Sequence, residues 1–167
     1  MPSKKRLVII PSAGMGRRMG SKKKNYLPLL GRPVLAHTLA AFEAAPSVDA
    51  VILAVPQDDI EFCKDEIVKK YKAGKVILVV AGGAERQDSV ANALEGSKGL
   101  GFDIIAVHDG ARPLVTVKVI EDTLRAAYES GSAIAAVPVK DTIKEALDWV
   151  VQRTIPRETL WSVQTPQ

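Results

Sequence analysis

Short apolar runs alternate with amphipathic stretches along the whole chain. Five of these runs are rich in Val, Ile, Leu and Ala and fit strands buried on both faces of a parallel sheet: 7–10, 48–55, 76–80, 104–107 and 133–139. Between them, apolar residues recur at helical spacing in four stretches: 33–43, about 60–68, about 91–94 and 117–128. This alternation predicts an α/β fold in which helices cover both faces of a doubly wound, mostly parallel, Rossmann-like sheet.

The turns that follow the strands carry most of the glycine and polar side chains. Right-handed crossovers place the carboxyl ends of parallel strands along one edge of the sheet, where such folds bind ligands. The loops 11–20, 81–90 and 108–113 follow three of the predicted strands. We therefore expect these loops to converge on one site.

The first loop combines glycine with concentrated positive charge. Gly14 and Gly16 let backbone N–H groups approach a ligand closely, while Arg17, Arg18 and the lysines 22–24 supply cations. This pattern predicts a polyphosphate cradle. A Walker loop is excluded because no Gly-Lys-Ser/Thr closes the motif.

A dinucleotide-dependent oxidoreductase is a weaker alternative that the sequence leaves open. Its fingerprint requires glycine where the chain has Met19, and an acidic residue at the end of the second strand, where the chain has Val55 and Pro56.

Length and composition limit the alternatives further. A chain of 167 residues with 47% hydrophobic residues is expected to form one domain, 1–167. The net charge of +4 comes mostly from basic residues near the first strand, and no aromatic residues are interleaved with them, so nucleic-acid binding is not expected. No apolar run is long enough to span a bilayer, so no membrane association is expected. The single cysteine, Cys63, is interpreted as a packing residue and fits a reducing cytoplasm.

Three smaller features complete the pattern. Asp58 and Asp59 are placed to cap the helix after the second strand, and His37 has no ligand-type residue at suitable spacing and is given no role. Asp109 follows a strand beside the predicted triphosphate site, where a carboxylate can share Mg²⁺ with phosphate oxygens; the alternative is a turn or helix-capping residue. Residues 140–154 predict a short two-stranded excursion, of the kind that pairs with a partner.

With the loops placed, the sequence resembles the 2-C-methyl-D-erythritol 4-phosphate cytidylyltransferases of the non-mevalonate isoprenoid pathway. The resemblance extends over the whole chain and rests on motifs in a fixed order: 10–19 (IPSAGMGRRM), 24–27 (KNYL), 82–90 (GGAERQDSV), 108–113 (HDGARP), 139–144 (VKDTIK), 160–161 (LW) and 165–167 (TPQ). It implies a nucleotidyltransferase that forms a cytidine diphosphate sugar alcohol and pyrophosphate from CTP and methylerythritol phosphate.

The resemblance also implies roles for individual residues. Arg18 and Lys24 correspond to the pair that stabilises the transition state, and Gly82, Gly83 and Ser89 to the positions that read cytosine. The full set implied to bind CTP is Pro11, Ser12, Ala13, Gly14, Gly16, Gly82, Gly83, Arg86, Ser89, Asp109 and Gly110. Asp109 is in addition the implied ligand of Mg²⁺ or another divalent cation.

The lysine cluster departs from the family pattern. The family usually has Pro-Lys-Gln-Tyr-Leu where this chain has Lys23-Lys24-Asn25-Tyr26-Leu27. Counting back from Tyr26 selects Lys24, but three adjacent lysines, 22–24, leave open which one reaches the phosphates.

For the acceptor, the resemblance points to Arg112, Thr142 and Arg157. Through a β-arm at about 139–156, Arg112 and Thr142 are expected to approach the site of a neighbouring subunit, so that a homodimer forms the complete site. Members of the family continue beyond Thr165-Pro166-Gln167 with a further lysine and threonine that contact the acceptor phosphate, so the C-terminal part of the family domain is expected to be absent here. Two alternatives stay open: a ribitol 5-phosphate cytidylyltransferase and a catalytically incompetent CTP-binding fragment.

Overall fold

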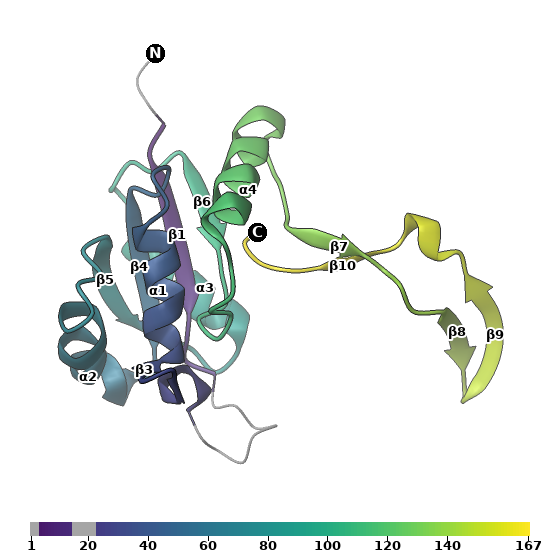
Figure 1. The fold of residues 1–167 in the computed structure, drawn as a ribbon, viewed down its shortest axis with the longest axis horizontal. Helices are drawn as coiled ribbons and strands as arrows, with labels where there is room; N and C mark the ends of the chain where they lie inside the picture. Colours follow the sequence, from purple (N-terminus) through teal and green to yellow (C-terminus); the bar gives the residue numbers. More distant parts are fainter. Residues whose placement is uncertain (1–3, 15–22) are drawn as a thin grey trace.

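A four-stranded parallel sheet forms the centre of the protein. The computed structural model describes residues 4–14 and 23–167 (Figure 1). The strand order is β5 (Val76–Ala81), β4 (Ala50–Val55), β1 (Arg6–Pro11) and β6 (Ile104–Val107), with every neighbouring pair parallel. The strands thus run third, second, first, fourth, so the chain leaves β1 towards one side and returns on its other side.

Burial explains which strands are central. Residues 7–10 of β1 are fully buried, and every residue of β4 is buried. Each Leu or Ile side chain buried in this way stabilises the fold by about 1.5–3 kcal/mol relative to its exposed state. β5 and β6 are only partly buried, as expected for strands at the two sides of a sheet.

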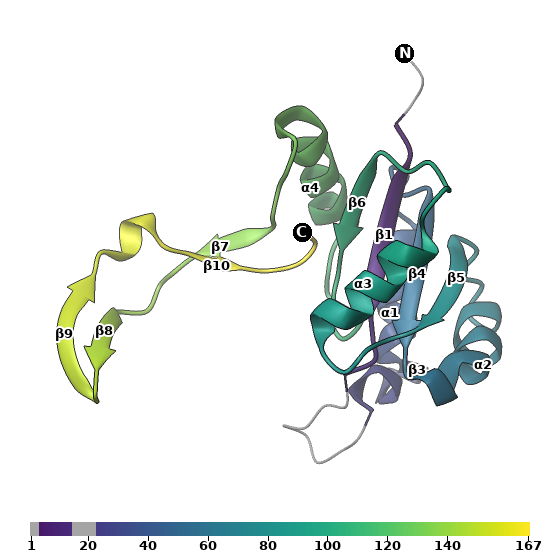
Figure 2. The same ribbon diagram turned by 180° about the vertical axis from the view of Figure 1, so that it is seen from behind.

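Helices cover both faces of the sheet. Helices α1 (Val34–Glu43) and α4 (Val117–Ser130) lie on the face seen in Figure 1, where they pack with Val8 and Ile10 of β1 into one hydrophobic cluster. Helix α3 (Arg86–Gly96) covers the opposite face (Figure 2), where Ala93 packs into a second cluster with Leu7 and Ile9. Alternate side chains of β1 therefore contribute to the two hydrophobic clusters on opposite faces of the sheet. The predicted doubly wound α/β fold is confirmed.

The helix predicted at about 60–68 has three parts. These are a 3-10 turn η3 (Gln57–Asp59), one turn of α2 (Ile60–Phe62) and a π-helical segment η4 (Cys63–Lys69). Cys63 is fully buried in the cluster under α1, as predicted. The capping prediction for Asp59 is wrong: its side chain makes no capping bond, because its carboxylate is paired with Lys23 instead.

The fifth predicted strand lies outside the main sheet. β7 (Ala136–Pro138) pairs antiparallel with β10 (Trp161–Val163) in a separate two-stranded ribbon. The position next to β6 is taken instead by the last residue, because Gln167 and Val107 exchange two backbone hydrogen bonds of 2.8 and 3.0 Å.

A hairpin projects from the body of the protein at the far end of this ribbon (Figure 1). It consists of β8 (Ile143–Leu147) and β9 (Val150–Ile155), joined through Asp148 and Trp149, whose φ angles are both positive. Trp149 at the tip is fully exposed. Short elements complete the fold: a 3-10 turn η2 (Lys24–Tyr26), β2 (Pro28–Leu29), β3 (Arg32–Pro33) and a 3-10 turn η5 (Arg157–Thr159). Across 4–14 and 23–167, every helix is too short or too polar to cross a membrane.

Candidate functional site

The three predicted loops meet at the carboxyl ends of the strands. Backbone hydrogen bonds continue the sheet beyond its strands: Ser12 N donates to Ala54 O at 2.7 Å, and Gly82 N donates to Val55 O at 2.7 Å. On the other side of β1, His108 N donates to Ile9 O at 2.9 Å. The loops after β1 and β6 therefore flank the point where the strand order reverses, which is where open α/β sheets form their ligand crevice.

Two glycines let the loops touch. A Cβ on Gly82 would lie 2.2 Å from the Cβ of Ala13, and a Cβ on Gly110 would lie 2.0 Å from Oγ of Ser12. Any other residue at either position would force the loops apart. The structure thus brings Ser12, Ala13, Gly82 and Gly110 together as predicted site residues.

Ser89 supports the second loop from beneath. Its Oγ accepts a hydrogen bond from Gly83 N at 3.0 Å and donates one to Glu85 O at 3.2 Å, and the side chain is buried. Glu85 also caps α3 in a capping box with Asp88. Ser89 is therefore placed beside Gly83 with its hydroxyl hydrogen directed at the loop backbone.

Asp109 is held between two arginines. Nε of Arg86 donates to Oδ1 of Asp109 at 2.9 Å, and Nε of Arg112 donates to Oδ2 at 2.9 Å. Burial raises the pKa of Asp109, but the hydrogen bonds and charges of the two arginines outweigh this and leave the pKa below its ordinary value. The carboxylate is therefore ionised near neutral pH and sits in a positively charged environment.

Two contacts to the last residues of the chain were not predicted from the sequence. Nη1 of Arg112 donates to Oε1 of Gln164 at 2.6 Å, and Oγ1 of Thr165 lies 3.0 Å from Nδ1 of the buried His108. Thr38 was also missed, since it reads as part of the buried face of a helix, yet its hydroxyl donates to Gly110 O at 2.8 Å. A polar hydroxyl on that otherwise apolar face is the sequence signal that could have identified it.

The described lysines of the cluster, Lys23 and Lys24, lie where the chain enters η2. Lys23 and Lys24 are both exposed, and Lys23 Nζ contacts both carboxylate oxygens of Asp59, at 2.5 and 2.7 Å. Nδ2 of the buried Asn25 donates to Ser12 O at 2.7 Å. Gly16 and Arg18 lie outside the described residues.

Thr142 and Arg157 are not brought to this site within one chain. Both belong to the projecting arm, where Arg157 donates from Nη1 to Lys140 O at 2.7 Å (Figure 1). His37 bonds through Nε2 to Leu29 O at 2.7 Å, which is a structural contact at the start of α1.

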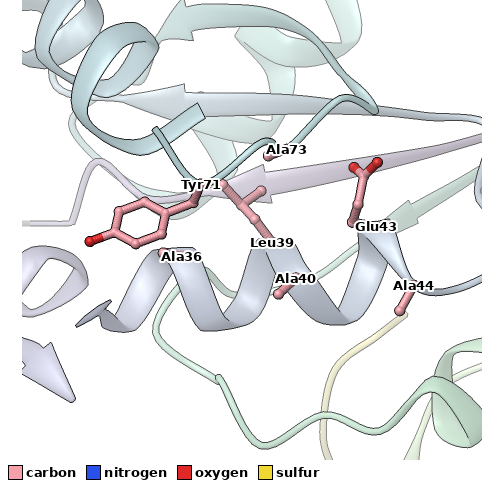
Figure 3. Close-up of a pocket in the computed structure, with 7 residues that line it drawn as sticks. All are labelled: Ala36, Leu39, Ala40, Glu43, Ala44, Tyr71 and Ala73. Carbon is pink, nitrogen blue, oxygen red and sulfur yellow. The ribbon is translucent and has the colours of Figure 1, made fainter. Parts of the chain in front are cut away.

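Two hollows in the surface differ in their chemistry. A cavity of about 480 Å³ opens beside the Asp109 loop and is lined by Arg112, Gln164 and Thr165, among mostly apolar residues at the start of α4 and along β7. A second hollow, between α1 and the segment after η4, is lined by alanines, Leu39 and Tyr71 (Figure 3). Its charged lining residue, Glu43, is acidic, so this hollow does not suit a phosphate ligand.

For a divalent cation, the described residues of this site supply few protein ligands. The described ranges 4–14 and 23–167 contain no cluster of three or more His, Cys, Asp or Glu side chains that could hold a metal ion. Asp109 is instead a single ionised carboxylate beside the predicted phosphate cradle. Mg²⁺ is commonly held by one or two carboxylates together with substrate phosphates, and an ion here would share the Asp109 oxygens with Arg86 and Arg112.

Comparison with known proteins decides the family. A family model described as IspD, 2-C-methyl-D-erythritol 4-phosphate cytidylyltransferase, matches residues 7–167. The chain belongs to this family.

Individual relatives support the same family assignment. The 2-C-methyl-D-erythritol 4-phosphate cytidylyltransferase of Syntrophotalea carbinolica is 50% identical over 161 residues, which cover 96% of this chain and 69% of the relative. That of Geobacter metallireducens is 46% identical over 162 residues, covering 95% of this chain and 70% of the relative. The chain thus spans about 70% of the length of these relatives.

Solved structures of the family share the fold. The crystal structure of the 4-diphosphocytidyl-2C-methyl-D-erythritol synthase of Anaerococcus prevotii superimposes with a TM-score of 0.81 at 30% identity, over 98% of this chain and 69% of that one. The cytidylyltransferase of Thermus thermophilus gives a TM-score of 0.69 at 32% identity, over 95% of this chain and 67% of that one. The family resemblance noted in the sequence is confirmed.

Proposed function

We propose that this protein transfers a cytidylyl group from CTP to 2-C-methyl-D-erythritol 4-phosphate, giving 4-diphosphocytidyl-2-C-methyl-D-erythritol and pyrophosphate. Its relatives are named for this reaction at up to 50% identity. The observation that carries the proposal is the contact between three loops at the reversal point of the sheet, where Gly82 meets Ala13 and Gly110 meets Ser12. Nucleotide ligands occupy this position in α/β sheets.

The phosphate-binding part of the proposal rests on charge and backbone. The backbone from Pro11 to Gly14, together with Gly16, would hold the triphosphate. Arg18 and Lys24 would neutralise the negative charge that builds up when the acceptor phosphate approaches the triphosphate. The acceptor phosphate oxygen attacks the α-phosphorus in line and pyrophosphate leaves. Since this oxygen is already anionic near neutral pH, catalysis consists of positioning and charge stabilisation.

Base recognition is assigned to the second loop. The buried Ser89 fixes the Gly83 backbone, which supports a rigid edge of N–H and C=O groups for cytosine to pair with. We assign CTP contacts to Gly82, Gly83, Arg86, Ser89, Asp109 and Gly110 as well.

We assign a divalent cation, Mg²⁺ being the first candidate, to the Asp109 carboxylate. When bound there, the ion would neutralise part of the triphosphate charge. Arg86 and Arg112 keep the same carboxylate ionised, so that its proton does not compete with the ion.

The acceptor is assigned to the side of Arg112. The cavity lined by Arg112 and Gln164 supports this assignment, because it opens directly beside the Asp109 loop. Thr142 and Arg157 lie on the projecting arm, which supports their action at the site of a second copy of the chain in a homodimer. We place the reaction in the cytoplasm, which agrees with a sequence containing one cysteine.

Acceptor choice tests the proposal. Pyrophosphate release from CTP is measured with 2-C-methyl-D-erythritol 4-phosphate and with ribitol 5-phosphate under identical conditions. The proposal expects release that depends on methylerythritol phosphate. Equal or faster release with ribitol 5-phosphate would assign the chain to the other acceptor.

A further inference from the structure

Lys23, at the end of the loop that follows β1, makes an ion pair with the neighbouring part of the fold. Lys23 pairs with both oxygens of Asp59, whose side chain is only 11% exposed. Asp59 belongs to η3, which follows β4 directly. The returning end of the loop is thereby fixed to a neighbouring strand's exit.

Three further contacts hold the next residues, Asn25 and Tyr26. Asn25 is buried and donates from Nδ2 to Ser12 O, which joins the first and last turns of the loop by one hydrogen bond. The Tyr26 hydroxyl lies 3.1 Å from Sγ of Cys63, and the Tyr26 ring packs edge to face on Phe62 with centroids 5.2 Å apart. Lys24 thus lies between anchored residues on both sides.

The neighbouring lysines differ in what their ammonium groups can do. The Lys23 ammonium is committed to a nearly buried carboxylate, and releasing it would leave that carboxylate without its partner. Lys24 makes no ion pair with any residue of 4–14 or 23–167. The geometry therefore separates an anchoring lysine from a lysine available to a ligand.

The backbone φ angle of Lys23 offers an independent way to fix the turn that the ion pair holds. Its φ is −66°. This is the angle that a proline ring imposes on the backbone. A proline at position 23 can therefore fix the turn without any ion pair, whereas an uncharged flexible side chain cannot.

We propose that Lys23 is a positioning residue: its ion pair with Asp59 fixes the 3-10 turn η2 so that Lys24 is presented to the triphosphate. The inference rests on the proposed function for its ligand, CTP. It distinguishes Lys23 from Lys24, because Lys23 binds the protein and not the nucleotide.

The test is a set of variants titrated with CTP by calorimetry. Lys23→Met and Asp59→Asn each remove the ion pair, and we expect each to weaken CTP binding about fivefold, because a preorganised turn becomes mobile. The double variant should be no weaker than either single variant, since both changes remove the same contact. Lys23→Pro should bind CTP within about twofold of the parent, because φ is fixed again. In that background, Asp59→Asn should have no further effect.

A matched control is available on the adjacent helical segment. Lys64→Met removes the lysine of an exposed pair with Glu61 and should leave CTP affinity unchanged. If Lys23 bound phosphate directly, Lys23→Pro would lose as much affinity as Lys23→Met, and Asp59→Asn would not weaken binding. That result would overturn the inference.

A measurement made without nucleotide tests the Lys23 anchor separately from the proposed function. Amide hydrogen exchange of residues 24–27 should be faster in Lys23→Met and Asp59→Asn than in the parent, and restored in Lys23→Pro. Equal affinity of the parent for CTP and UTP would reject the proposed function and the role of Lys23 in it. Unchanged exchange in every variant would reject the anchor itself.

Discussion

Thr165 donates its hydroxyl hydrogen to Nδ1 of His108 across 3.0 Å, and this bond ties the end of the chain to the loop that carries Asp109. The direction of the bond follows from the other side of the ring. Nε2 of His108 lies 3.2 Å from Arg112 O, and a carbonyl oxygen only accepts, so Nε2 carries the hydrogen and Nδ1 is the acceptor. Burial lowers the pKa of His108, which keeps the ring neutral and this arrangement intact.

Removing the Thr165 hydroxyl should therefore destabilise the protein. Thr165→Val keeps the shape of the side chain but leaves a nitrogen of the buried His108 unpaired, which costs about 1–3 kcal/mol. Thr165→Ser keeps the hydroxyl and is the matched control. Urea unfolding measures the free energy of unfolding of all three proteins. Equal stability of the Val and Ser variants would show that the bond is not made.

Asp109 should give the protein a characteristic response to acid. In the folded chain its pKa lies below the value of 3.8 that applies to a free side chain. Its ionised form is thus favoured by folding, so its contribution to stability is complete above the unfolded pKa and is lost as pH falls through the folded pKa. Asp109→Asn should differ from the parent most at pH values well above 3.8 and approach it as the pH falls through the lowered pKa of the folded protein.

The same urea experiment, repeated across this range, measures the effect. Glu158→Gln, on the exposed turn after β9, controls for the loss of one negative charge. A difference between Asp109→Asn and the parent that stays constant with pH would contradict the arginine pairing.

Arg18 and Lys24 should affect turnover far more than nucleotide binding. Replacing either with alanine removes a cation that is proposed to stabilise the transition state, at a cost of about 3–4 kcal/mol or two to three powers of ten in rate. Lys98→Ala, an exposed lysine near the end of α3, is the control. Steady-state pyrophosphate release with methylerythritol phosphate gives the rates. Near-normal turnover in both variants would remove them from the catalytic machinery.

The arm should determine the oligomeric state. Leu147, Trp149, Val150 and Val151 are all more than half exposed on the hairpin, which is far more apolar surface than an isolated hairpin tolerates in water. Replacing residues 143–155 with a short Gly-Ser turn should convert a dimer to a monomer in sedimentation velocity. Leu30→Asn, at an exposed position on the body of the protein, should leave the dimer intact. A monomeric parent would reject the dimer proposal.

The parts of the fold set by local pattern were predictable. The apolar runs of β1, β4, β5 and β6 carry their own signal, because a strand covered by helices on both faces has no polar alternation. The loops that follow these strands were found from glycine and charge. Their convergence then follows from the handedness of the crossovers rather than from any single residue.

The parts set by distant contacts were not predictable. Asp59 looks like a helix cap in sequence, and only the approach of Lys23, 36 positions earlier, gives its carboxylate another partner. The run 133–139 has the composition of a core strand, yet Gln167 occupies the place beside β6. The contacts of Thr165 and Gln164 with the Asp109 loop likewise join segments more than 50 residues apart.

Selective binding of CTP is the most direct test of the central claim. The 167-residue chain is titrated by calorimetry with CTP in the presence of Mg²⁺, with UTP, ATP and NAD as comparators. The three-loop site predicts that CTP binds more tightly than each comparator, since the rigid Gly82–Gly83 edge reads the base. Binding that does not distinguish CTP from UTP and ATP, in a sample whose folding is verified by circular dichroism, would contradict a cytidylyltransferase site.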